Sequence, residues 1–381
     1  MTARGFYTLF FSVVMLVTSL SVSSAGAFLL GCAALCTVAV SLLSVLAVFF
    51  TLDIRQEVDI NDTVRGEKCL YTLTVRQFSL LPAAPLSLRV CMPSGRQSDF
   101  SLNTNLFGST VSENRFLCPH VGVHAVGVTA VRISDCFSMF SLVKGVKTPP
   151  EQVTVLPNPI RTEPLTFSPG EGEASAIERA QADPTTPTDT RIWQEGDELK
   201  RVHWKLSMRR QQLIVHTYEQ NQRPDALVLL DCAQPDAPEN RRAAVIDLLT
   251  ESCAGVLKAL LDAGHAVQMP LEGSREVGGA GAEALSRMLR ELAKESFSGQ
   301  TEFSRVLALS ARRMHRTGAA AILSTRLTPR VADDVIALSR MGPHTAFCLV
   351  TAEAMSAEQE KLMRLLSASG IDARHVCAAV S

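Results

Sequence analysis

One stretch, "RIWQEGDELKRVHWKLSMRRQQLIVHTYEQ", residues 191–220, gathers side chains that could do chemistry. It surrounds His203 and the two tryptophans of the chain, Trp193 and Trp204, with basic side chains. These are Arg191, Lys200, Arg201, Lys205, Arg209 and Arg210. Guanidinium groups clamp carboxylates in bidentate fashion and stack on indole rings. Such a cluster is typical of an active site, a phosphate cradle or a protein-docking surface.

The local pattern favours a turn held by its own charges. Gly196 can adopt a positive φ, and Asp197 can bond nearby backbone amides. Arg191 and Arg201 could clamp Asp197 or Glu195. We therefore expect a self-buttressed loop that organises the edge of a strand at 213–218. A docking surface for a partner protein is the second interpretation, because Arg and Trp dominate binding hot spots.

Phosphate or nucleic-acid contact is a third interpretation of the cluster, but the composition gives it little support. The chain of 381 residues has a net charge of -1 and a pI near 6.7. These values give no reason to expect a nucleic-acid partner. The length suits two or three domains.

Signatures of catalysis are missing from the sequence. It contains no P-loop, no H-E-x-x-H and no G-x-S-x-G. His203 and Ser207 are neighbours in sequence, but a hydrolase would also need an acid partner and an oxyanion hole. The glycines of residues 278–281 read as a flexible loop before a helix. We therefore expect no enzyme, with a hydrolase of unknown type as an alternative.

Two places could bind a metal ion. Cys118, His120 and His124 would share one face of an extended strand, but no fourth ligand is evident. Asp231 ends a short buried strand, where a carboxylate could bind Mg²⁺ or cap nearby backbone. The ten cysteines form no C-x-x-C pair and fit small buried hydrophobes kept reduced in a cytosol.

The N-terminus is apolar. No charged residue lies between Gly5 and Leu52, and the runs 6–22 and 26–50 are separated by Ser23-Ser24-Ala25-Gly26. A helix of about 20 apolar residues crosses a bilayer, so residues 1–52 predict a transmembrane hairpin that anchors the chain in lipid. A cleaved signal peptide is the alternative for the first run. Arg4 and Arg55 place the large C-terminal part in the cytoplasm, which makes this a multi-pass protein of the cell membrane.

The rest of the chain changes its periodicity twice. Residues 53–160 contain period-two segments and predict a β-sandwich-like unit. Residues 161–190 are rich in Pro, Gly, Ser, Thr and acids and predict a linker or surface loop. In the last range, 191–381, strands alternate with helices, which predicts an α/β domain with a parallel sheet. Ligands of such sheets bind beyond the C-terminal ends of the strands.

The stretch "RIWQEGDELKRVHWKLSMRRQQLIV" closely resembles the hallmark of domain-of-unknown-function family 58. The resemblance rests on Arg191, Gly196, Asp197, Arg201, Trp204, Lys205, Ser207 and Arg209, with Trp193 in place of the family's aromatic and Met208 in place of its usual alanine. Upstream, "RISDCFSMF" (residues 132–140) is similar to the family's D-P-F-G-L-F, with Cys136 and Ser138 in place of proline and glycine. "VTVLPNP" (residues 153–159) resembles its strand-and-proline exit.

The resemblance implies a C-terminal domain like that of von Willebrand factor A, a Rossmann-like fold. Such domains hold Mg²⁺ with an Asp-x-Ser-x-Ser loop; here Asp231 remains, and Ala233 and Pro235 stand where the serines would be. We therefore expect a degenerate metal site and no cofactor. The resemblance also implies a bacterial accessory or adaptor protein that binds a MoxR-type AAA+ ATPase and other membrane proteins in cell-envelope or complex maturation. An Mg-dependent von Willebrand factor A-type binding module is the alternative.

Overall fold

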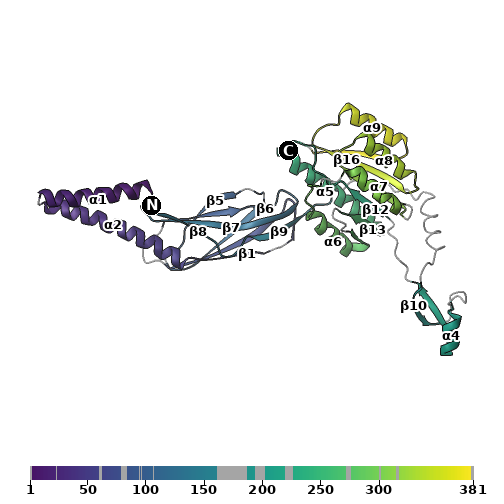
Figure 1. The fold of residues 1–381 in the computed structure, drawn as a ribbon, viewed down its shortest axis with the longest axis horizontal. Helices are drawn as coiled ribbons and strands as arrows, with labels where there is room; N and C mark the ends of the chain where they lie inside the picture. The colour runs from purple at the N-terminus through teal and green to yellow at the C-terminus, as the bar shows by residue number, and fades with distance from the viewer. Residues whose placement is uncertain are drawn as a thin grey trace. The chain divides into compact units, whose positions relative to one another are not determined.

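A computed structural model describes residues 2–22, 24–59, 62–78, 84–93, 95, 97–105, 107–160, 187–193, 202–218, 226–271, 276–299, 302–314 and 317–378. The chain divides into two compact units, Met1–Leu156 and Pro157–Ser381. Figure 1 shows their elements.

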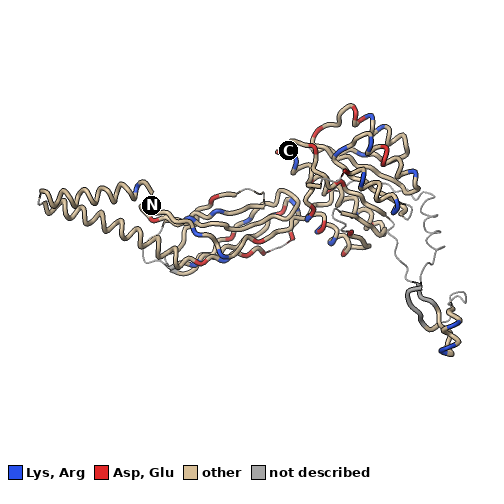
Figure 2. Tube along the Cα trace, viewed as in Figure 1, with Lys and Arg blue, Asp and Glu red and all other residues tan. Residues whose placement is uncertain are grey.

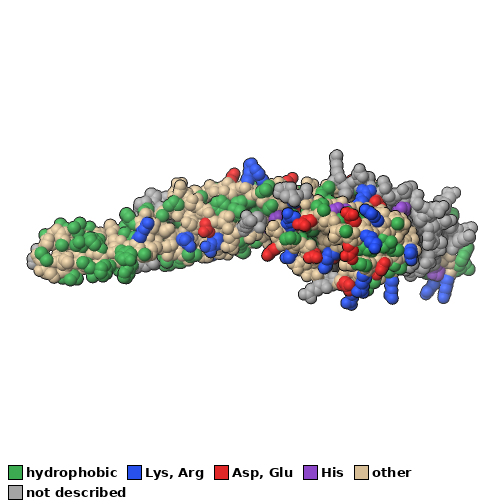
Figure 3. Space-filling model, turned by 90° about the horizontal axis from the view of Figure 1, so that it is seen from above, with side chains coloured by type: hydrophobic (Ala, Val, Ile, Leu, Met, Phe, Trp, Pro, Cys, Tyr) green, Lys and Arg blue, Asp and Glu red, His purple; other side chains and the backbone are tan. Residues whose placement is uncertain are grey.

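The first unit begins with two antiparallel helices, α1 (Ala3–Val22) and α2 (Ala25–Thr51), both long and apolar enough to cross a membrane. Arg4 is the only charged residue within them, and Figure 2 accordingly shows both helices almost entirely in tan. Hydrophobic side chains cover much of their visible surface in Figure 3. The helices pack closely: Ser12 Oγ donates to the Gly31 carbonyl at 2.9 Å. The expected hairpin is therefore present as two helices of membrane-spanning length.

A β unit follows, in which two sheets share one core. One sheet has the order β1-β3-β6, and the other has the order β2-β9-β7-β4-β5 with β8 paired to β7. The strands are β1 (Asp53–Val58), β2 (Asp62–Val64), β3 (Lys68–Phe78), β4 (Leu86–Cys91), β5 (Gln97–Leu102), β6 (Phe107–Leu117), β7 (Gly122–Ser134), β8 (Ser141–Gly145) and β9 (Glu151–Leu156). Alternate residues of β3, such as Tyr71 and Leu73, point into the core.

The end of α2 belongs to the core of this β unit. Val45, Val48 and Leu52 are buried among the side chains of β3, β4 and β7. Helix α2 therefore continues past its pairing with α1 and ends as a packed part of the β unit.

The second unit is built on a six-stranded sheet of order β14-β13-β12-β15-β16-β17. Its strands are β12 (Ala226–Leu230), β13 (Val267–Pro270), β14 (Glu276–Gly279), β15 (Ala319–Ser324), β16 (His344–Thr351) and β17 (Asp372–Cys377). All are parallel except β14, which pairs antiparallel with β13. The interpretation of residues 278–281 as a loop was therefore wrong at Gly278 and Gly279, which end an edge strand.

Helices cover both faces of this sheet. They are α5 (Glu239–Asp262), α6 (Gly281–Ala293), α7 (Phe303–Met314), α8 (Pro329–Ser339) and α9 (Ala357–Ala368). Val228 packs in one core with α5 and α6, whereas its neighbours Leu227 and Leu229 pack in another with α7, α8 and α9. Because β12 is buried on both faces, its sequence is a continuous apolar run.

Three further elements contain the basic stretch. Strand β10 (Pro187–Ile192) pairs antiparallel with β11 (Ile214–Tyr218), and helix α4 (Trp204–Arg210) lies between them in sequence. We call residues 187–193 and 202–218 the motif module. Two expectations are corrected here: β10 begins inside the range predicted as a linker, and residues 204–210 form a helix instead of a loop.

Candidate functional sites

Strand β11 is the centre of the motif module. In the β10–β11 ladder, Ile192 lies opposite Ile214. Val215 of β11 also forms an isolated bridge with Val202. The His203 amide donates to the Ile214 carbonyl at 2.8 Å. Val202, Ile214 and Val215 are buried. These apolar side chains form a small core for the module.

Helix α4 is fixed at its start by His203 and in its middle by Ser207. The Nδ1 atom of His203 accepts from the Leu206 amide at 3.2 Å and caps the helix. Ser207 is buried, and its Oγ accepts from the Ile214 amide at 2.9 Å and donates to the His203 carbonyl at 3.0 Å. Ser207 therefore joins α4 to β11, which gives this motif residue a structural role.

One face of α4 is exposed. Trp204 and Met208 are 60% and 80% exposed, one helical turn apart. Lys205 and Arg209 are exposed on the neighbouring stripe, again four residues apart. We call these four residues the Trp204 face. No acidic residue occurs between positions 202 and 218, so the face combines a large apolar area with positive charge only.

The remaining motif residues are described only in part. The backbone of Arg191, in β10, pairs with that of Val215, in β11. The Trp193 amide donates to the Leu213 carbonyl at 2.8 Å. The Arg191 side chain and all of Gly196, Asp197 and Arg201 lie outside the described residues. The expected clamp of arginines on Asp197 therefore stays a prediction.

Asp231 immediately follows β12 and is buried. Its Oδ1 atom accepts from the Ala233 amide at 3.1 Å, and its Oδ2 atom accepts from Ser324 Oγ at 2.7 Å. Both oxygens therefore have partners within the protein, from the ends of β12 and β15. Sequence reasoning did not find Ser324, because it contacts Asp231 only through the pairing of two strands far apart in the chain.

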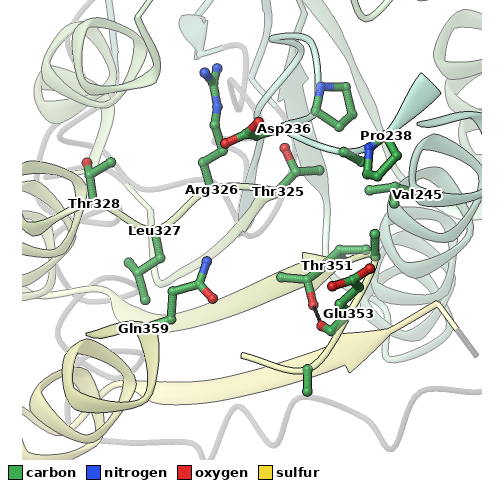
Figure 4. Close-up of a pocket in the computed structure, with 15 residues that line it drawn as sticks. Asp236, Pro238, Val245, Thr325, Arg326, Leu327, Thr328, Thr351, Glu353 and Gln359 are labelled. Carbon is green, nitrogen blue, oxygen red and sulfur yellow. Dashed lines mark hydrogen bonds between the residues drawn. The ribbon is translucent and has the colours of Figure 1, made fainter. Parts of the chain in front are cut away.

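A cavity of about 350 Å³ opens beside the C-terminal ends of β12, β15 and β16. Figure 4 shows Thr325 and Arg326 from the segment after β15, with Thr351 at the end of β16 and Glu353 just beyond it. Glu353 pairs with Arg241 at 3.0 Å. Burial lowers the pKa of His375, whose Nε2 atom lies 2.7 Å from Thr351 Oγ1. The cavity lies where parallel sheets bind ligands.

The residues near Asp231 do not fit Mg²⁺. A hard cation needs several oxygen ligands, yet Ala233 and Pro235 offer no side-chain oxygen and the Asp231 carboxylate already has two partners. Among the described residues, no three His, Cys, Asp or Glu side chains are placed to hold a metal ion.

The sequence hypothesis of a metal face at Cys118, His120 and His124 was wrong. Cys118 is buried just after β6, whereas His124 lies in β7, so the three residues do not share one strand. His124 Nε2 instead lies 3.0 Å from the His120 carbonyl.

Comparison with known proteins finds a family match within the second half of the chain. The family model described as "Protein of unknown function DUF58" matches residues 189–352. No curated protein matches. Among solved structures, Cwp6 from Clostridium difficile is 11% identical with a TM-score of 0.21, covering 85% of this chain and 49% of that one. Parabacteroides merdae β-glucuronidase is 8% identical with a TM-score of 0.18, covering 86% and 39%. The chain spans about half the length of the first structure and less than half of the second. TM-scores this low do not indicate a shared fold.

Proposed function

Residues 189–352 of this chain are a DUF58 domain, and from that premise we propose that the protein is a membrane-anchored adaptor that docks a partner protein on its Trp204 face. The partner we propose is a MoxR-type AAA+ ATPase, in a process of cell-envelope or complex maturation. This partner is taken from the family resemblance of the motif.

The exposure of Trp204 and Met208 is the observation that carries the proposal. Exposing large apolar side chains to water is unfavourable, and burial against a partner would remove this cost. Tryptophan is among the residues that most often form binding hot spots. Lys205 and Arg209 beside them favour a partner surface that is acidic around an apolar centre.

The membrane hairpin supplies the anchor in this proposal. Thr2 donates its amide to the Met139 carbonyl, so the start of α1 lies beside the β unit that follows α2. Arg4 and Arg55 then flank the hairpin on one side, and the turn at the other end contains no charge. The positive-inside rule assigns the charged side to the cytoplasm, so the β unit and the second unit would face the cytoplasm.

The proposed role is not catalytic. The Ser207 hydroxyl is held by backbone groups of Ile214 and His203, and His203 Nδ1 is held by the Leu206 amide. A serine nucleophile instead needs its hydroxyl next to a free base.

The sheet order and the position of Asp231 support a von Willebrand factor A-like domain, but the poor fit to Mg²⁺ argues against the Mg-dependent alternative.

Capture from membranes tests this proposal. Tagged full-length protein is solubilised gently, and the MoxR-type ATPase is measured in the bound fraction by mass spectrometry. Trp204→Ala with Met208→Ala should lose it. The matched control is Leu309→Ala, which removes a 70% exposed leucine from α7 and should retain it. Equal capture by all three proteins would contradict docking on the Trp204 face.

A further inference from the structure

The turn between β7 and β8, residues 135–140, is built around a buried carboxylate. We call these residues the Asp135 turn. Asp135 accepts from the Phe137 amide at 3.1 Å and from the Phe140 amide at 2.7 Å. Ser138 has a φ of 56°, a left-handed conformation that favours glycine. The carboxylate therefore holds a turn in which one residue is strained.

The Asp135 turn binds the start of the first apolar helix. Thr2, which immediately precedes α1, donates its amide to the Met139 carbonyl at 2.9 Å. Its Oγ1 atom lies 2.6 Å from the Ser138 carbonyl and 2.9 Å from that of Met139. The turn therefore lies beside the first residue of α1.

The neighbouring strand holds the end of the second helix. Lys144 of β8 donates from Nζ to the Phe49 carbonyl at 2.6 Å and to the Leu52 carbonyl at 2.8 Å. A lysine at this position satisfies carbonyls that the last helical turn leaves unpaired. With Val45 and Val48 in the β core, α2 cannot slide relative to the β unit.

Helix lengths place the Asp135 turn at the edge of the hydrocarbon. The 20 residues of α1 span about 30 Å, the thickness of a bilayer core. Helix α2 has 27 residues, but from Val45 onward one of its faces packs into the β core. Residues 25–44 of α2, which precede this contact, match α1 in length, and Thr2 stands at the end of this length because it immediately precedes α1. This is also the level of the Asp135 turn.

The side chains shown at this level suit a lipid interface. Phe137 is 57% exposed at the tip of the turn, although it is a large apolar ring. Arg4 is exposed two residues after Thr2, which contacts the turn. Amphipathic belts of aromatic and basic residues are typical of the boundary between headgroups and acyl chains.

We propose that the Asp135 turn is a second membrane contact, in which Phe137 inserts at the boundary between headgroups and acyl chains of the phospholipid while Arg4 meets the phosphates. This inference rests on the membrane anchor of the proposed function. It assigns the turn two tasks, which are to hold the hairpin and to set the depth and tilt of the β unit at the bilayer surface.

Quenching by brominated lipid tests this contact in the full-length chain. The protein is reconstituted into vesicles of phosphatidylcholine and phosphatidylglycerol whose acyl chains are brominated either near the headgroup or near the chain end. A tryptophan is added at Phe137, at Phe11 in the middle of α1, or at Val123. Val123 is a matched control, because it is exposed on β7 and about 36 Å along the strand from Ser134. Fluorescence is compared with that of the wild-type chain.

We expect the added fluorescence of Phe137→Trp to be lost most strongly with bromine near the headgroup. That of Phe11→Trp should be lost most strongly with bromine near the chain end, and that of Val123→Trp should persist with both lipids. If Phe137→Trp behaves like Val123→Trp while Phe11→Trp is quenched, the Asp135 turn does not touch lipid although the anchor stands. If Phe11→Trp is not quenched either, the membrane anchor itself fails.

Discussion

The hydroxyl of Ser207 lies 2.9 Å from the backbone nitrogen of Ile214 and joins helix α4 to strand β11. This bond explains why a serine occupies a motif position that could be mistaken for a nucleophile. It also fixes the helix that presents Trp204.

Ser207→Ala should destabilise the motif module. The change removes a buried acceptor from the Ile214 amide, a loss that costs about 1–3 kcal/mol. Hydrogen exchange of peptides from residues 202–218 should become faster. Ser286→Ala is the control, because Ser286 is an exposed serine on α6 that bonds only its own helix. A fluorophosphonate probe that labels the wild type but not Ser207→Ala would instead support a hydrolase.

Asp231→Ala should lower the stability of the α/β domain whether or not Mg²⁺ is present. The Ala233 amide and the Ser324 hydroxyl lose their acceptor, at a cost of about 1–3 kcal/mol. Thermal unfolding with and without Mg²⁺ should show no shift for the wild type. A bound ion would raise Tm by mass action, so a Mg²⁺-dependent rise that disappears in Asp231→Ala would revive the metal-dependent alternative.

Tyr71 should make the β unit sensitive to alkali. Burial, with a smaller effect of Glu151, raises the pKa of Tyr71 from 10.0 to about 12. Between these pH values the unfolded chain loses the phenolic proton while the folded chain keeps it, so stability should fall as pH rises through the window. Tyr71→Phe should reduce this slope.

Chemical unfolding of the full chain in detergent measures how the free energy of unfolding depends on pH. It is carried out below pH 10 and between pH 10 and about 12. Below pH 10, Tyr71→Phe should differ from the wild type by a constant, because only the bond of Tyr71 to Gln56 is lost. Equal slopes for both proteins above pH 10 would refute the assignment of the alkali sensitivity to Tyr71.

Gly31→Ala should loosen the helix pair. A methyl group at Gly31 would lie 2.9 Å from Leu16 Cγ and 3.2 Å from the Leu16 backbone nitrogen. Such overpacking costs about 1–3 kcal/mol, and the unfolding midpoint in detergent should drop. At Gly26 the same methyl group would meet only Ser24 Oγ at 3.9 Å. An equal drop for Gly26→Ala would mean that glycine itself, and not the close approach to Leu16, sets the stability.

The sequence predicted those parts of the fold whose pattern is local. The apolar runs placed both long helices, because hydrocarbon length requires an uninterrupted stretch. The all-apolar strand β12 was predicted because both of its faces are buried. The edge strand β14 was missed because Gly278 and Gly279 interrupt the alternation of polar and apolar residues. The strand is held by its backbone pairing with β13, which the sequence does not show.

The candidate sites were predictable only in part. The composition of residues 191–220 identified Trp204 and its basic neighbours, but a helix of seven residues gives too few periods to be recognised. The cavity lining comes from the ends of three strands, and the contacts of Lys144 with α2 join residues more than 90 positions apart. Contacts of this kind depend on the tertiary fold and leave no local signal.

Binding of a purified MoxR-type ATPase to the full-length protein in lipid nanodiscs tests the central claim most directly. We expect Trp204→Ala with Met208→Ala to weaken binding at least about 30-fold, the equivalent of a hot spot of about 2 kcal/mol. Leu309→Ala should bind like the wild type. Unchanged affinity for the double variant, with hydrogen exchange of residues 202–218 like that of the wild type, would contradict docking on the Trp204 face.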